Sequence, residues 1–153
     1  MNTHPTILAL DASSTTIGFV VYAGQVLAHG EHKLGGADIA CRCQTARDIL
    51  RMLLGRYPEV AVVAIESPVA LHAKAVIPQA RVSGALLGLV AERFGLLWCE
   101  VPPAQAKRAL TGHGNADKPA MQRAALAYGV IGEHASDAVG VAKAAAGMIK
   151  VVA

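Results

Sequence analysis

Three features are missing from this 153-residue sequence: a disulfide framework, a membrane-spanning run and a secretory signal. Cys41 and Cys43 are separated by one residue, a spacing that suits neither a zinc knuckle nor a disulfide pattern, so we expect reduced, structural cysteines. The longest apolar run, residues 82–91, is interrupted by Gly84 and Gly88 and is too short to span a membrane. The first residues lack a basic region before an apolar stretch, which predicts a soluble cytoplasmic protein without a membrane partner.

Apolar residues are abundant by contrast, at 54% of the chain, which argues against disorder and predicts one globular domain over residues 1–153. The chain has 14 Lys and Arg against 11 Asp and Glu, and its net charge is +3. A moderate positive charge is compatible with a polyanionic partner but does not identify one.

The pattern of apolar residues predicts a mixed α/β protein. The expected strands lie at residues 6–11, 16–22, 25–33, 60–66 and 95–101, and the expected helices at 38–54, 78–94, 104–110, 118–128 and 134–150. The first three strands are joined by short turns and therefore form an antiparallel meander. Strands and helices alternate in the second half, which indicates parallel pairing there. We expect a five-stranded sheet flanked by helices.

The expected helix 78–94 is apolar around most of its circumference. Such a helix must be covered on more than one side. One reading places one face on the sheet and another on a partner chain, and the other buries the helix within a single chain; periodicity does not separate them. Gly84 and Gly88, one turn apart, would let another backbone approach closely.

Two apolar strands end in a carboxylate, Asp11 in the first and Glu66 in the fourth. An isolated carboxylate in an apolar setting is costly unless it is paired, hydrogen-bonded or bound to a metal, although Glu66 also fits a solvated strand end. His134 and Asp137 share a face of the last helix. If the two strands are neighbours, these four side chains form a ligand set suited to Mg²⁺ or Mn²⁺. Two such ions about 3.5–4 Å apart can support phosphodiester hydrolysis.

Five segments carry a family resemblance, in collinear order over nearly the whole chain. They are DASS and a glycine within 11–18, AIES at 64–67, QAR at 79–81, QAKRALTGHGNADK at 105–118 and HASDAVGVA at 134–142. This pattern resembles the RuvC family of Holliday junction resolvases, of the phage-type or short bacterial kind, in the RNase H-like superfamily. The segment 105–118 discriminates best, because an Asp-bearing strand and a late DA-helix occur across many RNase H-like nucleases.

The resemblance implies an RNase H-like fold, a homodimer, a helicase partner, and metal-dependent cleavage of four-way DNA junctions by paired nicks. By position, Asp11, Glu66 and Asp137 match three family carboxylates, and His134 occupies the fourth metal position, which is Asp in many members and His in others. An imidazole must be neutral to bind metal, so a site that is slower or differently metal-selective at low pH is a hypothesis.

Basic positions carry over in the same way. Lys107 and Lys118 match residues that contact junction DNA or stabilise charge at the scissile phosphate, although solvated helix lysines are the alternative. The hydroxyl of Ser14 would orient a ligand or cap its turn. The expected DNA-contacting residues are Ser14, His72, Lys74, Arg81, Lys107, Arg108, His113, Asn115 and Lys118.

The chain departs from the family pattern in two places. DASS stands where DPGS is frequent, which a turn accommodates. Between Glu66 and QAR there is no aromatic residue of the kind that stacks on bases at the crossover in many members; Val69, Leu71 and His72 are what the segment offers. The mode of junction opening and the cleavage-sequence preference are therefore left open.

Three other functions compete. A YqgF-type RNA-processing nuclease would also carry the Asp-bearing strand and the ESP after the fourth strand, but not the lysine-containing TGHGNADK segment. A non-catalytic junction-binding protein that recruits a helicase would not need the full ligand set. A sugar-kinase or actin-like ATPase needs two domains, and this chain has room for one.

Overall fold

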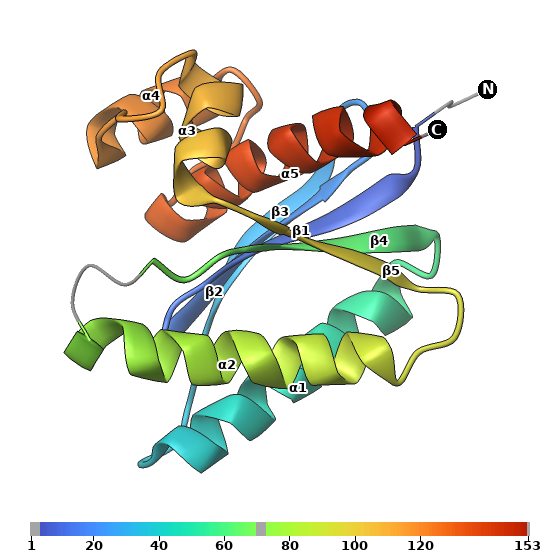
Figure 1. Ribbon diagram of the computed structural model, residues 1–153, viewed down its shortest axis with the longest axis vertical. Coiled ribbons are helices and arrows are strands. Elements are labelled where there is room, and N and C mark those ends of the chain that lie inside the picture. The colour runs from blue at the N-terminus through green and yellow to red at the C-terminus, as the bar shows by residue number, and fades with distance from the viewer. Residues whose placement is uncertain (1–3, 70–72, 153) are drawn as a thin grey trace.

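A five-stranded sheet forms the middle layer of the molecule, in a computed structural model that describes residues 4–69 and 73–152 (Figure 1). Strands β1 (Thr6–Ala12), β2 (Thr16–Tyr22), β3 (Val26–Lys33), β4 (Val60–Glu66) and β5 (Leu97–Val101) lie in the order β3-β2-β1-β4-β5. The first three strands are antiparallel, whereas β4 runs parallel to β1 and β5 parallel to β4. The predicted mixed sheet is confirmed.

Helices cover both faces of the sheet, which is why β1 and β4 have continuous apolar sequences. The helices are α1 (Ile39–Arg56), α2 (Ala73–Ala91), α3 (Pro103–Thr111), α4 (Lys118–Leu126) and α5 (Glu133–Val152). Helices α1 and α2 lie on one face, and α5, with α3 and α4 packed beside it, lies on the other (Figure 1). Alternate residues of β1 enter the two core layers, because successive strand side chains point to opposite faces.

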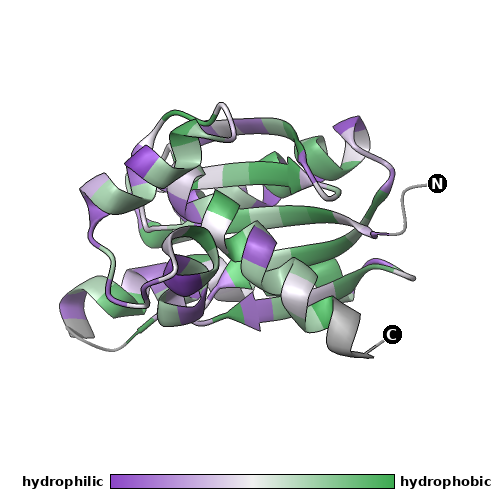
Figure 2. Ribbon diagram, turned by 90° about the horizontal axis from the view of Figure 1, so that it is seen from above, coloured by the Kyte–Doolittle hydropathy of each residue, from purple (hydrophilic) through white to green (hydrophobic). Residues whose placement is uncertain are grey.

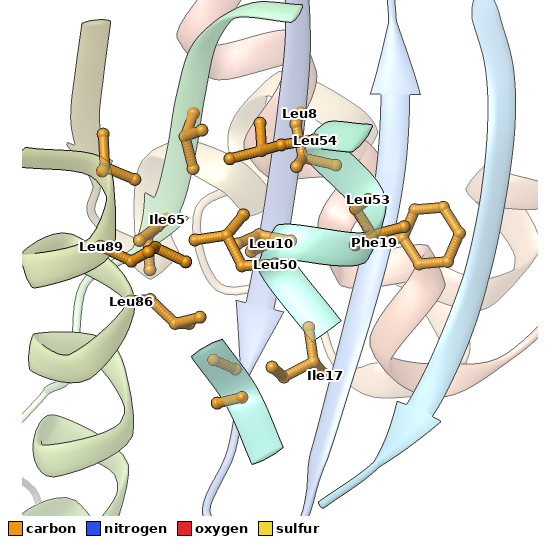
Figure 3. Packing of buried hydrophobic residues seen from close by; sticks show 14 of the residues in the cluster. Leu8, Leu10, Ile17, Phe19, Leu50, Leu53, Leu54, Ile65, Leu86 and Leu89 are labelled. Carbon is orange, nitrogen blue, oxygen red and sulfur yellow. The ribbon is translucent and has the colours of Figure 1, made fainter. Parts of the chain in front are cut away.

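The two layers differ in side-chain size. On the α1 and α2 face, large side chains interdigitate between the sheet and the helices: Leu8, Leu10, Ile17, Phe19, Leu50, Leu53, Leu54, Ile65, Leu86 and Leu89 (Figure 3). On the other face, the buried residues of α5 are small, Ala135, Ala138, Val139, Val141, Ala142 and Ala145. Small residues let this helix lie close to the central strands, whose hydrophobic character is visible in Figure 2.

Helix α2 differs most from its predicted boundaries. It begins at Ala73, five residues before the predicted start at 78, and it ends at Ala91, so Lys74 lies in a helix rather than in a loop. Pro78 is inside the helix. Proline was expected to mark the start, because it is favoured in the first turn. Within the second turn its missing N–H removes one backbone hydrogen bond, and the packing of the following buried residues offsets this loss.

Most other boundaries lie within two residues of prediction, and β2 and β4 have the predicted bounds. Asp38 is the N-cap of α1 rather than its first residue, accepting a hydrogen bond from Cys41 N–H at 2.8 Å. The predicted N-cap Asp117 is confirmed and accepts from Ala120 N–H at 2.9 Å. Strand β1 extends to Ala12, so Asp11 lies inside the strand and not at its end.

One side of α2, the turn that follows it and the α2-facing side of the edge strand β5 carry exposed apolar residues, which we call the α2–β5 surface: Ile77, Gly84, Phe94 and Trp98. A Cβ at Gly84 would meet no heavy atom within 4 Å. Helix α2 is therefore covered by the sheet and α1 on one side and open on the other, so burial within a single chain is the wrong reading. No helix within residues 4–69 and 73–152 combines the length and apolar character needed to cross a membrane.

Candidate metal centre

Asp11 and Glu66 occupy matching positions on neighbouring strands. The last paired residues of β1 and β4 are Leu10 and Ile65, and each is followed directly by its carboxylate. Leu10 and Ile65 face α1 and α2, so Asp11 and Glu66 point to the opposite face, toward α5. Asp11 is only 7% exposed. The first and fourth strands are neighbours, which was the condition for these two carboxylates to meet.

The first turn of α5 lies directly on β2 where Gly18 pairs with Asp11. A Cβ at Gly18 would be 2.2 Å from the carbonyl carbon of His134 and 2.6 Å from the backbone nitrogen of Ala135. Only glycine permits this approach. The close approach brings the His134 ring to Asp11, where Nδ1 donates a hydrogen bond to Oδ2 at 2.8 Å. The helix that begins here also carries Asp137, which lies near the same Asp11 carboxylate.

Burial and the neighbouring charges shift the pKa values of these side chains. Burial, reinforced by the charges of Asp11 and Asp137, raises the pKa of Glu66 to about 8. Burial and the charge of Asp11 raise the pKa of Asp137 to about 7. The hydrogen bond with Asp11 raises the pKa of His134. The cluster therefore gathers carboxyl groups in a largely buried setting, and the positive charges of Lys107 and His134 offset only part of the resulting rise in the pKa of Glu66.

The donor chemistry of this cluster fits a divalent cation. Three carboxylates and an imidazole are the ligands that Mg²⁺ and Mn²⁺ accept, and a cation would stabilise the charged carboxylates against the burial and the mutual repulsion that raise the two pKa values. In the part of the chain that the structure describes, no three His, Cys, Asp or Glu side chains already stand in a coordinating arrangement.

The raised pKa values predict that the metal-free protein loses stability as pH rises. Glu66 and Asp137 ionise near pH 4.5 and 3.8 in an unfolded chain but near 8 and 7 in the fold, so the folded state binds more protons across this window. Stability should fall between about pH 5 and pH 8. Glu66→Gln should raise the metal-free melting temperature at pH 8 by about 4 °C, corresponding to roughly 1–2 kcal/mol.

Thermal denaturation in a chelator at pH 5.5 and pH 8 measures this effect. Glu59→Gln, an exposed glutamate before β4, is the matched control and should leave the profile unchanged. A Glu66→Gln variant with the pH profile of the wild type would contradict the raised pKa of Glu66.

The two predicted lysines lie within electrostatic reach of the cluster. The positive charge of Lys107, from α3, lowers the pKa of Glu66 against the larger raising effects. Lys118, at the start of α4, forms an ion pair with Glu133, and this hydrogen bond, with a smaller contribution from the charge of Asp137, raises the lysine pKa. The structure therefore brings together the six predicted catalytic residues, although their roles stay predictions.

The other predicted DNA-contacting residues are dispersed over the surface of α2, α3 and the loop after α3. Lys74 and Arg81 are exposed on α2, and Arg108, His113 and Asn115 are exposed on α3 and the following loop. His72 and Leu71 lie outside the described residues.

The turn between β1 and β2 corrects one prediction. Ser13, rather than Ser14, caps this turn, because its Oγ accepts hydrogen bonds from the N–H groups of Thr15 and Thr16. A ligand-orienting role for Ser14 stays a prediction. Beyond β4, Val69 is 47% exposed, so an aliphatic residue is accessible in the segment where the family resemblance leads one to expect an aromatic.

Two residues at the centre were missed as functional candidates. Glu31 accepts a hydrogen bond from Ala135 N–H at 3.0 Å, and Glu133 pairs with Lys118. Strand alternation predicts which face Glu31 occupies, but no sequence signal indicates which helix crosses that face.

Comparisons with known proteins show which family the chain resembles. Crossover junction endodeoxyribonuclease RuvC of Synechococcus sp. (strain WH7803) is 35% identical over 83 residues, 54% of this chain and 52% of that protein. The chain thus spans about half the length of the curated relatives it matches.

Thermus thermophilus RuvC has a similar fold, with a TM-score of 0.77 at 20% identity and 96% coverage of both chains. The same protein in complex with Holliday junction substrate gives 0.80 at 22% identity and 97% coverage of both. The predicted RNase H-like fold is confirmed. The family model of crossover junction endodeoxyribonuclease RuvC matches residues 7–145, and the chain therefore belongs to the RuvC family.

Proposed function

We propose that this chain is one RNase H-like nuclease domain that resolves four-way DNA junctions by paired phosphodiester hydrolysis. The observation that carries the proposal is the convergence of Asp11, Glu66, His134 and Asp137 at one end of two central strands. The family and the junction complex of Thermus thermophilus RuvC support branched DNA as the substrate.

Membership of the RuvC family implies a divalent metal cofactor. We propose Mg²⁺ or Mn²⁺, two ions per site, held by Asp11, Glu66, His134 and Asp137. When bound, such ions supply an activated water and stabilise the leaving oxygen. Buried Asp11 fixes the position of the site on the sheet, and Glu66 and Asp137 contribute charge that the ions neutralise.

Basic residues at the rim are proposed to hold the phosphate backbone. Lys107 reaches the cluster from α3, and the Lys118 side chain is largely exposed beside Glu133. An exposed ion pair of this kind is weak, so a DNA phosphate can replace Glu133 as the partner of Lys118. Arg108, His113 and Asn115 are exposed on α3 and its loop and are further candidates for phosphate contacts, although Arg108 lies beside Ala144 and Gly147 in the later part of α5.

His134 makes the proposed site sensitive to pH. Its Nδ1–H donates to Asp11, which leaves Nε2 as the nitrogen for a metal once the ring is neutral. Because the hydrogen bond raises the pKa of His134, protons compete with metal at low pH. Between pH 6 and pH 8, the wild-type nicking rate should rise more steeply than that of His134→Ala; parallel profiles would contradict the hypothesis.

We also propose a homodimer, because paired nicks need two catalytic centres and the described part of one chain provides one cluster. The α2–β5 surface supports this proposal, since it is apolar and open on the side away from the sheet. Sedimentation equilibrium tests it, and a strictly monomeric protein with full junction-resolving activity would contradict it. A helicase partner stays a prediction of the family resemblance.

The experiment that tests the function compares nicking of a synthetic four-way junction, a linear duplex and a structured RNA with Mg²⁺ or Mn²⁺. We expect symmetrical nicks in the junction and little cleavage of the other substrates. Preferential RNA cleavage would favour a YqgF-type activity. Tight junction binding without cleavage in either metal would favour a non-catalytic junction-binding protein.

A further inference from the structure

Glu31, on the edge strand β3, contacts the backbone of the helix that carries two of the proposed metal ligands. Its Oε1 accepts a hydrogen bond from Ala135 N–H at 3.0 Å. Ala135 directly follows His134 and precedes Asp137 by two residues. The N–H groups of a first helical turn have no partner within their own helix, and a carboxylate also complements the positive end of the helix. Glu31, which lies on a strand distant in sequence, thus provides the contact that an N-cap residue usually provides.

The pairing register places Glu31 opposite Asp11 across a gap. Asp11 pairs with Gly18, and Gly18 pairs with Glu31, so the three residues form one row across β1, β2 and β3. The central member has no side chain, and the backbone of His134 occupies that space. Asp11 therefore holds the turn through the His134 ring on one side, and Glu31 holds it through a backbone N–H on the other. Two anchors fix the rotation of the turn as well as its position.

The residue before α5 is adapted to this contact. Gly132 has a φ of +112°, which favours glycine, and a Cβ there would be 2.6 Å from Glu31 Oε1. A side chain at this position would displace the carboxylate. The backbone of the loop before α5 therefore leaves room for the Glu31 carboxylate. This is a second observation that supports the contact, separate from the hydrogen bond to Ala135.

We propose that Glu31 is a positioning residue of the metal centre, which orients the first turn of α5 so that His134 and Asp137 face Asp11. The inference rests on the proposed function and deepens it, because it assigns the geometry of the metal ligands to a residue outside the ligand set. Outer partners of metal ligands typically change metal affinity by about 10–100-fold when they are removed.

The test measures Mn²⁺ binding by calorimetry in wild type, Glu31→Ala and Glu31→Gln. We expect about tenfold weaker binding in Glu31→Ala, and affinity close to wild type in Glu31→Gln, whose amide oxygen still accepts from Ala135 N–H. Junction nicking by Glu31→Ala should recover at high Mn²⁺, which a merely structural defect would not allow. Glu59→Ala, an exposed glutamate at the far end of β4, is the matched control.

A second readout needs neither metal nor DNA. Hydrogen exchange at the Ala135 amide should be about tenfold faster in Glu31→Ala than in wild type, and the Glu31→Gln rate should lie close to wild type. Unchanged exchange at Ala135, or unchanged Mn²⁺ affinity, in Glu31→Ala would overturn the inference. If the wild type nicks no junction while the Ala135 exchange still responds to Glu31, the proposed function fails and the positioning role stands.

Discussion

Asp11→Asn should reduce the rate of junction nicking by about 10³-fold or more. Asp11 is the most buried carboxylate of the cluster, it adjoins Glu66 on the neighbouring strand, and it holds the ring of His134. Asparagine keeps the shape but removes the charge that a divalent ion requires. Metal activation is worth several kcal/mol, and about 4 kcal/mol corresponds to a factor of roughly 10³ in rate. Single-turnover nicking of a four-way junction with Mg²⁺ or Mn²⁺ measures the loss.

The matched control is Asp48→Asn, which neutralises an exposed carboxylate on α1 that pairs with Arg51. It should nick at the wild-type rate, because exposed ion pairs contribute little. Junction binding by Asp11→Asn should persist, since the basic rim is unchanged. Full activity in Asp11→Asn would show that the cluster is not the catalytic centre.

Gly18→Ala should disturb both the fold and the site. The new Cβ would be 2.2 Å from the carbonyl carbon and 2.3 Å from the carbonyl oxygen of His134, and these are backbone atoms that cannot rotate away. Either α5 or β2 must shift. We expect a destabilisation of about 3 kcal/mol and a melting temperature lowered by roughly 10 °C. A displacement of His134 and Asp137 by about 1 Å should also cost about 10²-fold in nicking rate.

Gly147→Ala provides the comparison within the same helix. Gly147 is exposed on α5, and a Cβ there would meet no heavy atom within 4 Å. Alanine should therefore stabilise the helix by about 0.5–1 kcal/mol and leave nicking unchanged. A Gly18→Ala variant that melts at the wild-type temperature would contradict the close approach of α5 to β2.

The members of the cluster were predictable from the sequence because each carries a local signal, although their role as metal ligands stays a prediction. Asp11 and Glu66 stand out as carboxylates on apolar strands, and His134 and Asp137 share a helical face by their spacing. The adjacency of the two strands was a condition of that prediction, and the sheet order confirms it.

The residues that hold the ligands were not predictable in the same way. The contact of Glu31 with Ala135 joins residues 104 positions apart, and it depends on cross-strand register, which one sequence does not define. The close approach at Gly18 likewise appears only when α5 is docked. Local chemistry misled in two places: Pro78 suggested a helix start, and capping of the turn, one of two roles considered for Ser14, is provided by Ser13.

The row formed by Asp11, Gly18 and Glu31 also determines where this family member tolerates changes in length. Inserting or deleting one residue in β1, β2 or β3 would turn the side chains that follow it to the opposite face of the sheet. Asp11, Gly18 and Glu31 would then no longer form one row on the face that packs against α5. Insertions in exposed turns, such as the one at Gly24, leave the row intact. Length variation among relatives of this chain should therefore be concentrated in the turns and rare within the three strands.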